Sequence, residues 1–125
     1  MTTRAARYLS CCILVMAVMA GFLTPANAEE TFPLRPYYPE VPFIGTDKLL
    51  DIYDSAIIVD IRSSFEYDVA RVNKALLLPL TDTEFAEKLE KIRPKTDPTP
   101  MAFYCNGHSC AKSYQAAQLA LSLGF

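Results

Sequence analysis

The sequence predicts an α/β domain in which a parallel β-sheet is covered by helices on both faces. Three short apolar runs, at residues 56–61, 76–78 and 101–104, have the composition of buried parallel strands. Segments with the apolar spacing of amphipathic helices separate and follow these runs. Strands that alternate with helices along a chain form parallel sheets, because each helical crossover returns the chain to the same end of the sheet.

Residues 1–28 have the pattern of a secretory signal peptide. Arg4 and Arg7 supply positive charge, residues 8–23 form an apolar run, and Ala26-Asn27-Ala28 is a small-residue cleavage site. The apolar run has about 16 residues, which is short for the alternative of a retained membrane anchor, since a span needs about 20. We therefore expect cleavage after Ala28, a periplasmic or secreted protein, and no stable membrane insertion of the mature chain.

Charge and cysteine content limit the functions that the chain can have. It contains 12 Lys and Arg residues against 14 Asp and Glu residues, so we expect no basic face and no nucleic-acid partner. Removal of the signal peptide would leave only Cys105 and Cys110 of the four cysteines. Two cysteines are too few for a disulfide-stapled scaffold, but in an oxidising compartment two nearby cysteines can pair.

Residues 29–43 form a proline-rich lead-in to the domain. The prolines recur at every third position, at Pro33, Pro36, Pro39 and Pro42, and three residues is the period of a polyproline II helix. We interpret this segment as a stiff connection that packs its aromatic side chains on the domain, namely Phe32, Tyr37, Tyr38 and Phe43. The alternative interpretation is a docking segment for an aromatic-lined groove.

The first half of the domain, which begins at residue 44, is expected to contain one short helix and two strands. Thr46 can serve as the N-cap of a helix over residues 47–53. The run at residues 56–61 is rich in β-branched side chains and predicts the first strand, and residues 76–78 predict the second.

The second half of the domain is expected to contain two helices and one strand. Asp82 or Thr83 can cap a helix that continues to Ile92 and has an apolar inner face. A loop rich in proline leads to the third strand over residues 101–104. The last helix has an alanine- and leucine-rich face, and Gly124 is well placed as its C-cap.

Reactive or charged residues follow two of the predicted strands. Asp60-Ile61-Arg62 ends the first strand and Cys105 follows the third, so both should lie at the carboxyl edge of the sheet, where ligand sites of such sheets occur. Cys105 precedes the loop Asn106-Gly107-His108-Ser109-Cys110-Ala111, in which Gly107 permits unusual backbone angles. Loop N–H groups, a helix N-terminus and the nearby cation of Lys112 would stabilise a thiolate and an anion bound to it.

The two reactive segments resemble the rhodanese-like, thiosulfate sulfurtransferase-type domain family. The first matching block contains Asp60-Ile61-Arg62, Glu66-Tyr67, Ala70-Arg71-Val72-Asn73-Lys74-Ala75 and Leu76-Leu77-Leu78-Pro79. The second contains Tyr104-Cys105, the loop, and an Ala-Ala-containing helix that ends in Gly-aromatic. The resemblance covers residues 44–125 and implies a three-layer sandwich with a central parallel sheet flanked by helices. Members of the family normally continue beyond the point that corresponds to Phe125, so the C-terminal part is expected to be missing.

The resemblance also implies roles for individual residues. Cys105 would be the nucleophile that accepts a sulfane sulfur as a persulfide, and Lys112 would stand where the family usually has a catalytic Arg. The substrate-binding loop would comprise Asn106, Gly107, His108, Ser109, Cys110, Ala111 and Ser113. Asp60, Arg62 and Glu66 would be structural, with Arg62 and Glu66 as a candidate ion pair across the strand end.

The sequence departs from the family pattern near the cysteine. The loop is longer than usual, with Cys110 at the usual position of the Arg, and Arg71 and Asn73-Lys74 replace a familiar His and Pro-Gly. Longer loops in this superfamily occur in phosphatases, but Lys112 lacks the planar fork with which Arg binds a tetrahedral oxyanion.

Three functions remain open from the sequence. The first is sulfur transfer through a Cys105 persulfide, with a small sulfur-containing donor, a thiol or cyanide acceptor and a possible protein partner. The second is thiol–disulfide redox chemistry between Cys105 and Cys110, and the third is a non-catalytic binding module. No cofactor is expected, and no metal site either, because His108 and the two cysteines have no evident fourth ligand.

Overall fold

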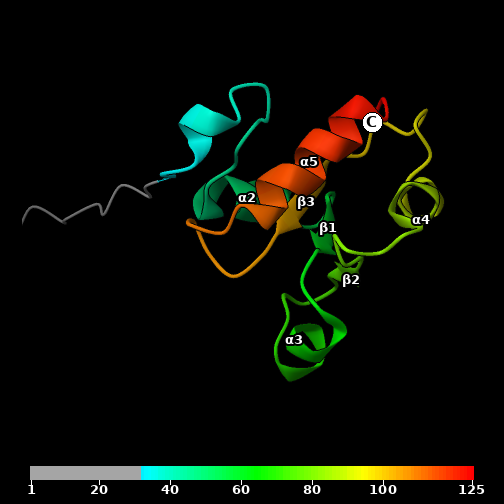
Figure 1. Ribbon diagram of the computed structural model, residues 1–125, viewed down its shortest axis with the longest axis horizontal. Helices are drawn as coiled ribbons and strands as arrows, with labels where there is room; N and C mark the ends of the chain where they lie inside the picture. The colour runs from blue at the N-terminus through cyan, green and yellow to red at the C-terminus, as the bar shows by residue number, and fades with distance from the viewer. Residues whose placement is uncertain (1–31) are drawn as a thin grey trace, which may run out of the picture.

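The computed structural model describes residues 32–125 (Figure 1). The predicted signal peptide and its cleavage after Ala28 lie outside the described residues, as do the first three residues of the lead-in. Within the described part of the chain, no helix is both long enough and apolar enough to cross a membrane.

Helices and strands alternate along the domain, as the sequence predicts. The elements are η1 (Arg35–Tyr37), α2 (Thr46–Ile52), β1 (Ile57–Asp60), α3 (Ser64–Val69), β2 (Leu76–Leu77), α4 (Phe85–Ile92), β3 (Met101–Tyr104) and α5 (Lys112–Ser122). The strands form one parallel sheet in the order β2-β1-β3. The predicted α/β class and parallel sheet are therefore confirmed.

The sheet separates two apolar clusters, and this separation makes the domain a three-layer sandwich (Figure 1). Side chains of a strand alternate between the faces of the sheet. Val59 of β1 belongs to the cluster that includes residues of α4 and α5, whereas Ile58 belongs to the cluster on the side of α2 and α3. Leu89 of α4 is fully buried, and complete burial of a leucine side chain stabilises a fold by about 2 kcal/mol.

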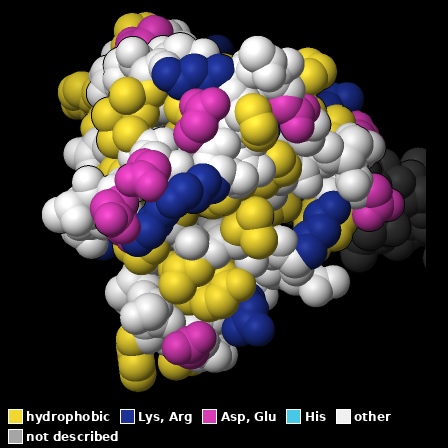
Figure 2. Space-filling view, turned by 90° about the vertical axis from the view of Figure 1, so that its right-hand side faces the viewer, with side chains coloured by type: hydrophobic (Ala, Val, Ile, Leu, Met, Phe, Trp, Pro, Cys, Tyr) yellow, Lys and Arg dark blue, Asp and Glu magenta, His cyan; other side chains and the backbone are white. Residues whose placement is uncertain are grey.

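The solvent-facing side of α4 carries charges of both signs. Lys88 pairs with Glu84 at 3.2 Å, and Lys91 pairs with Glu87 at 2.8 Å, both at i,i+4 spacing. On the face of the molecule that Figure 2 shows, acidic and basic side chains lie beside one another, with hydrophobic side chains between them. Exposed pairs of this kind contribute little to stability, so α4 is held mainly by its buried face.

Two helix starts differ from the prediction. Thr46 is the first residue of α2 and not its N-cap, which is Gly45. For α4, the N-cap is Glu84, and neither predicted cap residue serves that role. The Oδ1 atom of Asp82 instead accepts the Glu84 N–H at 2.9 Å. An aspartate that binds the N–H two residues ahead forms a turn, and this turn delays the start of the helix.

Helix α3 was not predicted, although a sequence signal for it exists. Ser63 is the N-cap, and its hydroxyl accepts the Glu66 N–H while the Glu66 carboxylate accepts the Ser63 N–H. This reciprocal arrangement is a capping box, which Ser or Thr followed three residues later by Glu or Gln predicts.

The end of α5 confirms the role expected of Gly124. The residue follows the C-cap Leu123 and has a φ angle of 86°. The Gly124 N–H donates to Leu121 and the Phe125 N–H donates to Ala120, each at 3.0 Å. This double closure is a Schellman motif, in which glycine supplies the left-handed conformation at little steric cost.

The lead-in packs its aromatic side chains but does not form the predicted polyproline II helix. Residues 35–37 turn into a short 3-10 helix instead of remaining extended. The ring of Tyr38 stacks on that of Tyr114 at 5.0 Å, and Phe32 lies 4.9 Å from the ring of Phe43. Tyr37 is 75% exposed, and Phe43 remains 40% exposed despite its contact with Phe32. Burial of aromatic surface outweighs the extended preference of the prolines, because each ring removes a large apolar area from water.

The segment of residues 70–75, between α3 and β2, is held by side chains from several elements. Its hydrogen bonds run from Arg62 to the Ala70 carbonyl, from the Val72 N–H to the Tyr104 hydroxyl, from Tyr53 to the Asn73 carbonyl and from Tyr67 to the Ala75 carbonyl. Lys74 has a φ angle of 56° and is the only non-glycine residue with a positive φ among the described residues. Such a conformation costs a side chain with a Cβ atom about 1–2 kcal/mol.

We predict that Lys74→Gly has a free energy of unfolding about 0.5–1 kcal/mol higher than Lys74→Ala, because glycine removes the left-handed strain and the alanine variant keeps it. The Lys74 ammonium lies 4.4 Å from the centre of the Tyr53 ring. Both variants lose this contact, so their difference isolates the backbone effect. Urea unfolding measures it, and equal stability of the two variants would contradict the prediction.

Candidate functional site

The carboxyl ends of β1 and β3 meet at one edge of the sheet. Asp60 lies opposite Tyr104 in the parallel register, so Arg62 and Cys105 follow the strands at the same edge, as predicted. Cys105 and the contact between Asp60 and Tyr104 nevertheless lie on different faces of the sheet. Cys105 packs with the cluster of α4 and α5, whereas Tyr104, which binds Asp60, packs with the cluster on the side of α2 and α3. The alternation of side chains along β3 imposes this division.

Cys105 and Cys110 are paired as a disulfide. Their Cα atoms are 6.5 Å apart, within the range that disulfides require. Between them, the Cys110 N–H donates to the Gly107 carbonyl at 3.0 Å, and Gly107 has a φ angle of 134°. The glycine therefore adopts the unusual conformation expected from the sequence, and it closes the turn that brings the two sulfurs together.

The surroundings of the Cys105 sulfur differ from the prediction that loop N–H groups face it. The sulfur lies 3.5 Å from the Cys110 carbonyl oxygen and 3.6 Å from the Ser113 hydroxyl. No N–H group of the described loop donates to it, and the Cys110 N–H is used by Gly107. In the disulfide state the Ser113 hydroxyl of α5 thus lies beside the Cys105 sulfur, and none of the predicted hydrogen bonds from loop N–H groups to this sulfur is formed among the described residues.

The other predicted loop residues have distinct environments. His108 is exposed and stacks on the ring of Phe32 at 4.6 Å. Ser109 is exposed, and Ala111 is the N-cap of α5. Lys112 is exposed at the first position of α5, and no described contact links it to Cys105.

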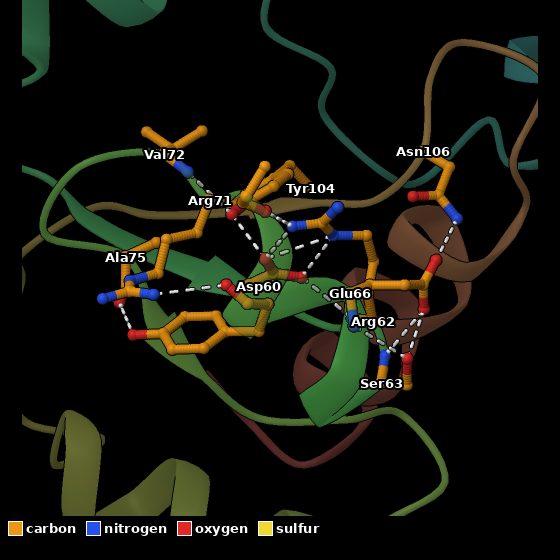
Figure 3. A network of polar contacts seen from close by, with 11 residues as sticks. Asp60, Arg62, Ser63, Glu66, Arg71, Val72, Ala75, Tyr104 and Asn106 are labelled. Carbon is orange, nitrogen blue, oxygen red and sulfur yellow. Dashed lines mark hydrogen bonds and ion pairs between the residues drawn. The ribbon is translucent and has the colours of Figure 1, made fainter.

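Glu66 connects the cysteine loop to the N-terminus of α3 (Figure 3). One carboxylate oxygen accepts the Asn106 side-chain amide at 2.7 Å, and the other accepts the Ser63 N–H at 3.0 Å and its hydroxyl at 2.6 Å. Hydrogen bonds from Ser63 and Asn106, with the charge of Lys112, lower the pKa of Glu66 to about 2. The prediction of an Arg62–Glu66 ion pair is wrong, because Ser63 and Asn106 donate to the Glu66 carboxylate instead.

Arg62 pairs instead with the buried carboxylate of Asp60 (Figure 3). The Nη2 atom lies 2.6 Å from Oδ2 and the Nε atom 2.9 Å from Oδ1, a two-pronged arrangement. The Tyr104 hydroxyl donates to Oδ2 at 2.5 Å. Burial by itself would raise the pKa of Asp60, but the hydrogen bonds from Arg62 and Tyr104 outweigh it and hold that pKa below its usual value. Asp60, Arg62 and Tyr104 thus form one hydrogen-bonded group at the carboxyl edge of the sheet.

A cavity of about 570 Å³ extends along β3, and Cys105 is one of the residues that line it. It is mostly apolar, and β3 is an edge strand that pairs only with β1 among the described strands. Two of its lining residues have buried polar atoms without a hydrogen-bond partner in the described part of the chain, Arg93 at Nε and Tyr114 at its hydroxyl. Sequence reasoning missed this cavity, because it is formed by the lead-in, α5 and β3 together.

Comparisons with known proteins agree with the fold. A family model described as Rhodanese-like domain matches residues 46–125. The protein described as "Uncharacterized 16.5 kDa protein in psaL 5'region" of Synechococcus elongatus is 30% identical over 70 residues, which cover 53% of this chain and 47% of that protein. The match thus spans about half the length of this relative. No solved structure matches significantly.

The Asp60 network yields a prediction about stability. Asp60→Asn leaves the largely buried Arg62 guanidinium without its counter-charge, and loss of one partner of a buried pair costs about 3 kcal/mol. Tyr104→Phe, which keeps the ion pair and loses one hydroxyl, should cost about 1–2 kcal/mol. Urea unfolding at neutral pH measures the free energy of unfolding of both variants. The expectation would be contradicted if Asp60→Asn lowered this free energy no more than Tyr104→Phe does.

The same network predicts the effect of acid. Because the pKa of Asp60 is lowered by folding, its ionisation stabilises the protein fully above the ordinary aspartate pKa. This contribution is lost as the pH falls through the lowered value. Asp60→Asn should therefore lose less stability between neutral and acidic pH than the parent chain, as measured by urea unfolding across that range.

Proposed function

The chain belongs to the rhodanese-like domain family, and we propose on this basis that it is a sulfurtransferase that carries a sulfane sulfur on Cys105. The observation that carries the proposal is the position of this cysteine. It follows β3 at the carboxyl edge of the sheet and lines the apolar cavity, immediately before the loop that leads into α5. Ligands of parallel sheets bind at such edges.

The proposed half-reaction begins with the Cys105 thiolate. The thiolate attacks the sulfane sulfur of a donor such as thiosulfate, a new S–S bond forms, and sulfite leaves with the electrons of the broken bond. The resulting persulfide then passes its outer sulfur to cyanide or to a thiol. Since the structure pairs Cys105 with Cys110, a thiol reductant must open the disulfide before the first step.

Nearby groups support thiolate chemistry at Cys105. The Ser113 hydroxyl, 3.6 Å from the sulfur, can donate a hydrogen bond to the thiolate. The N-terminus of α5 follows the loop and favours negative charge through its free N–H groups. In this proposal Lys112, at the first position of α5, attracts the anionic donor toward the loop of residues 106–111.

The disulfide itself favours a second candidate function, thiol–disulfide exchange. Cys105 and Cys110 would then cycle between dithiol and disulfide, without carrying an extra sulfur. The two candidates differ in the fate of the donor sulfur, since only sulfur transfer leaves a persulfide on Cys105.

We predict that Cys110→Ser, which cannot form the disulfide, gains the mass of one sulfur atom after reduction, desalting and incubation with thiosulfate. Fragmentation should map this sulfur to Cys105, and cyanide should remove it as thiocyanate. Cys105→Ser provides the matched control and should gain no sulfur. If Cys110→Ser keeps a free, unmodified Cys105 thiol under these conditions, the sulfurtransferase proposal fails.

We further propose that the mature protein acts in the periplasm after cleavage behind Ala28. The signal-peptide pattern of residues 1–28 and the presence of a disulfide support this location. N-terminal sequencing of the exported protein should begin at Glu29, and a chain that still begins at Met1 would overturn this proposal.

A further inference from the structure

Cys110 gives the site a second thiol that the sulfur-transfer half-reaction does not use. The geometry points to a role for it: we propose that Cys110 attacks the Cys105 persulfide, releases its outer sulfur as hydrosulfide, and forms the Cys105–Cys110 disulfide. This inference rests on the proposed persulfide. It turns the protein from a carrier of sulfane sulfur into a reductase that converts sulfane sulfur to hydrosulfide.

Backbone hydrogen bonds before and after Cys110 fix its position in the chain. On its N-terminal side, the hydrogen bond from its N–H to the Gly107 carbonyl closes a turn. On its C-terminal side, Ala111 is already the N-cap of α5, and the Ala111 carbonyl accepts the Gln115 N–H at 3.0 Å, as a helical bond. Cys110 is therefore held next to the Cys105 sulfur by local backbone structure, and it needs no movement of a distant element to reach that sulfur.

The attack balances in atoms and electrons. The Cys110 thiol loses its proton and bonds to the Cys105 sulfur, and the bond between that sulfur and the outer sulfur breaks. The outer sulfur leaves with the electron pair of this bond and takes up the proton, which produces hydrosulfide. Cys110 is oxidised to the disulfide level, and the outer sulfur is reduced.

Proximity favours this attack over the entry of an external acceptor. A thiol joined to its target by a short loop has an effective concentration in the millimolar range or above. Cys105 is also only partly exposed, in the lining of the cavity. The persulfide should therefore be resolved within the chain before a dilute acceptor reaches it.

A dithiol closes the catalytic cycle. It attacks the Cys105–Cys110 disulfide by thiol–disulfide exchange, leaves as its own disulfide, and restores both cysteine thiols. Over one cycle, thiosulfate and the dithiol are converted to sulfite, hydrosulfide, a proton and the oxidised dithiol. The electrons that reduce the sulfane sulfur come from the dithiol.

The experiment compares reduced, desalted protein with and without Cys110, in a single turnover with thiosulfate under anaerobic conditions. The parent chain should release one hydrosulfide per molecule and lose two hydrogens as the disulfide forms, with no persulfide left. Cys110→Ser should accumulate the persulfide and release no hydrosulfide. Cys105→Ser, in which the other cysteine carries the same change, should neither take up sulfur nor release hydrosulfide.

Two contrary results have separate meanings. If the parent chain retains the persulfide beside a free Cys110 thiol and releases no hydrosulfide, the resolving role is overturned and the sulfurtransferase proposal stands. If Cys110→Ser takes up no sulfur, the persulfide itself is absent and both proposals fall. A disulfide that forms without consumption of thiosulfate would likewise overturn the resolving role.

Discussion

The buried carboxylate of Asp60 is the centre of a hydrogen-bond network. This network connects the sheet, the loop before β2 and the residues that follow β1. Asp60 is fully buried, and a buried carboxylate without partners would cost several kcal/mol. Arg62 and Tyr104 supply these partners. Arg62 also binds the Ala70 carbonyl and Tyr104 the Val72 N–H, so one charge ties β1, β3 and the loop of residues 70–75 together. The edge from which Cys105 emerges owes its shape to this network.

Cys105, the proposed nucleophile, is near this network in sequence but on the other face of the sheet. Tyr104 and Cys105 are consecutive, and the alternation of a strand sends their side chains in opposite directions. A contact between Asn106 and Glu66 connects the cysteine loop to the N-terminus of α3. The charges of Asp60 and Arg62 thus lie away from the Cys105 sulfur. The loop that follows Cys105 is nevertheless bound to α3 through the contact between Asn106 and Glu66.

The Cys105–Cys110 disulfide takes part in both proposals, sulfur uptake by Cys105 and release of hydrosulfide by Cys110. In this state the Cys110 carbonyl and the Ser113 hydroxyl lie beside the Cys105 sulfur, and a carbonyl oxygen is a poor neighbour for a thiolate because both carry negative charge. Sulfur uptake needs a free Cys105 thiolate, and Cys105 is bonded to Cys110 in this state, so opening of the disulfide has to precede it. In the proposed cycle, formation of the same bond follows hydrosulfide release, so the oxidised loop is the product state and a dithiol returns it to the reactive state.

Periodicity and local chemistry were enough to predict the strand at residues 101–104, the order of the elements apart from α3, the parallel sheet and the turn at Gly124, because these depend on apolar patterns and backbone preferences along the chain. The candidate Cys105 and its loop also followed from the sequence and from the resemblance that its motifs carry. Local chemistry did not predict the start of α4, where the Asp82 side chain competes for the Glu84 N–H, nor the folding of the lead-in against Tyr114. Only the tertiary structure decided which carboxylate pairs with Arg62, that Cys110 reaches Cys105, and that Cys105 lines a cavity along β3. These contacts depend on distances between segments far apart in the chain or on the exact path of a loop, and a linear pattern of residue types does not contain those distances.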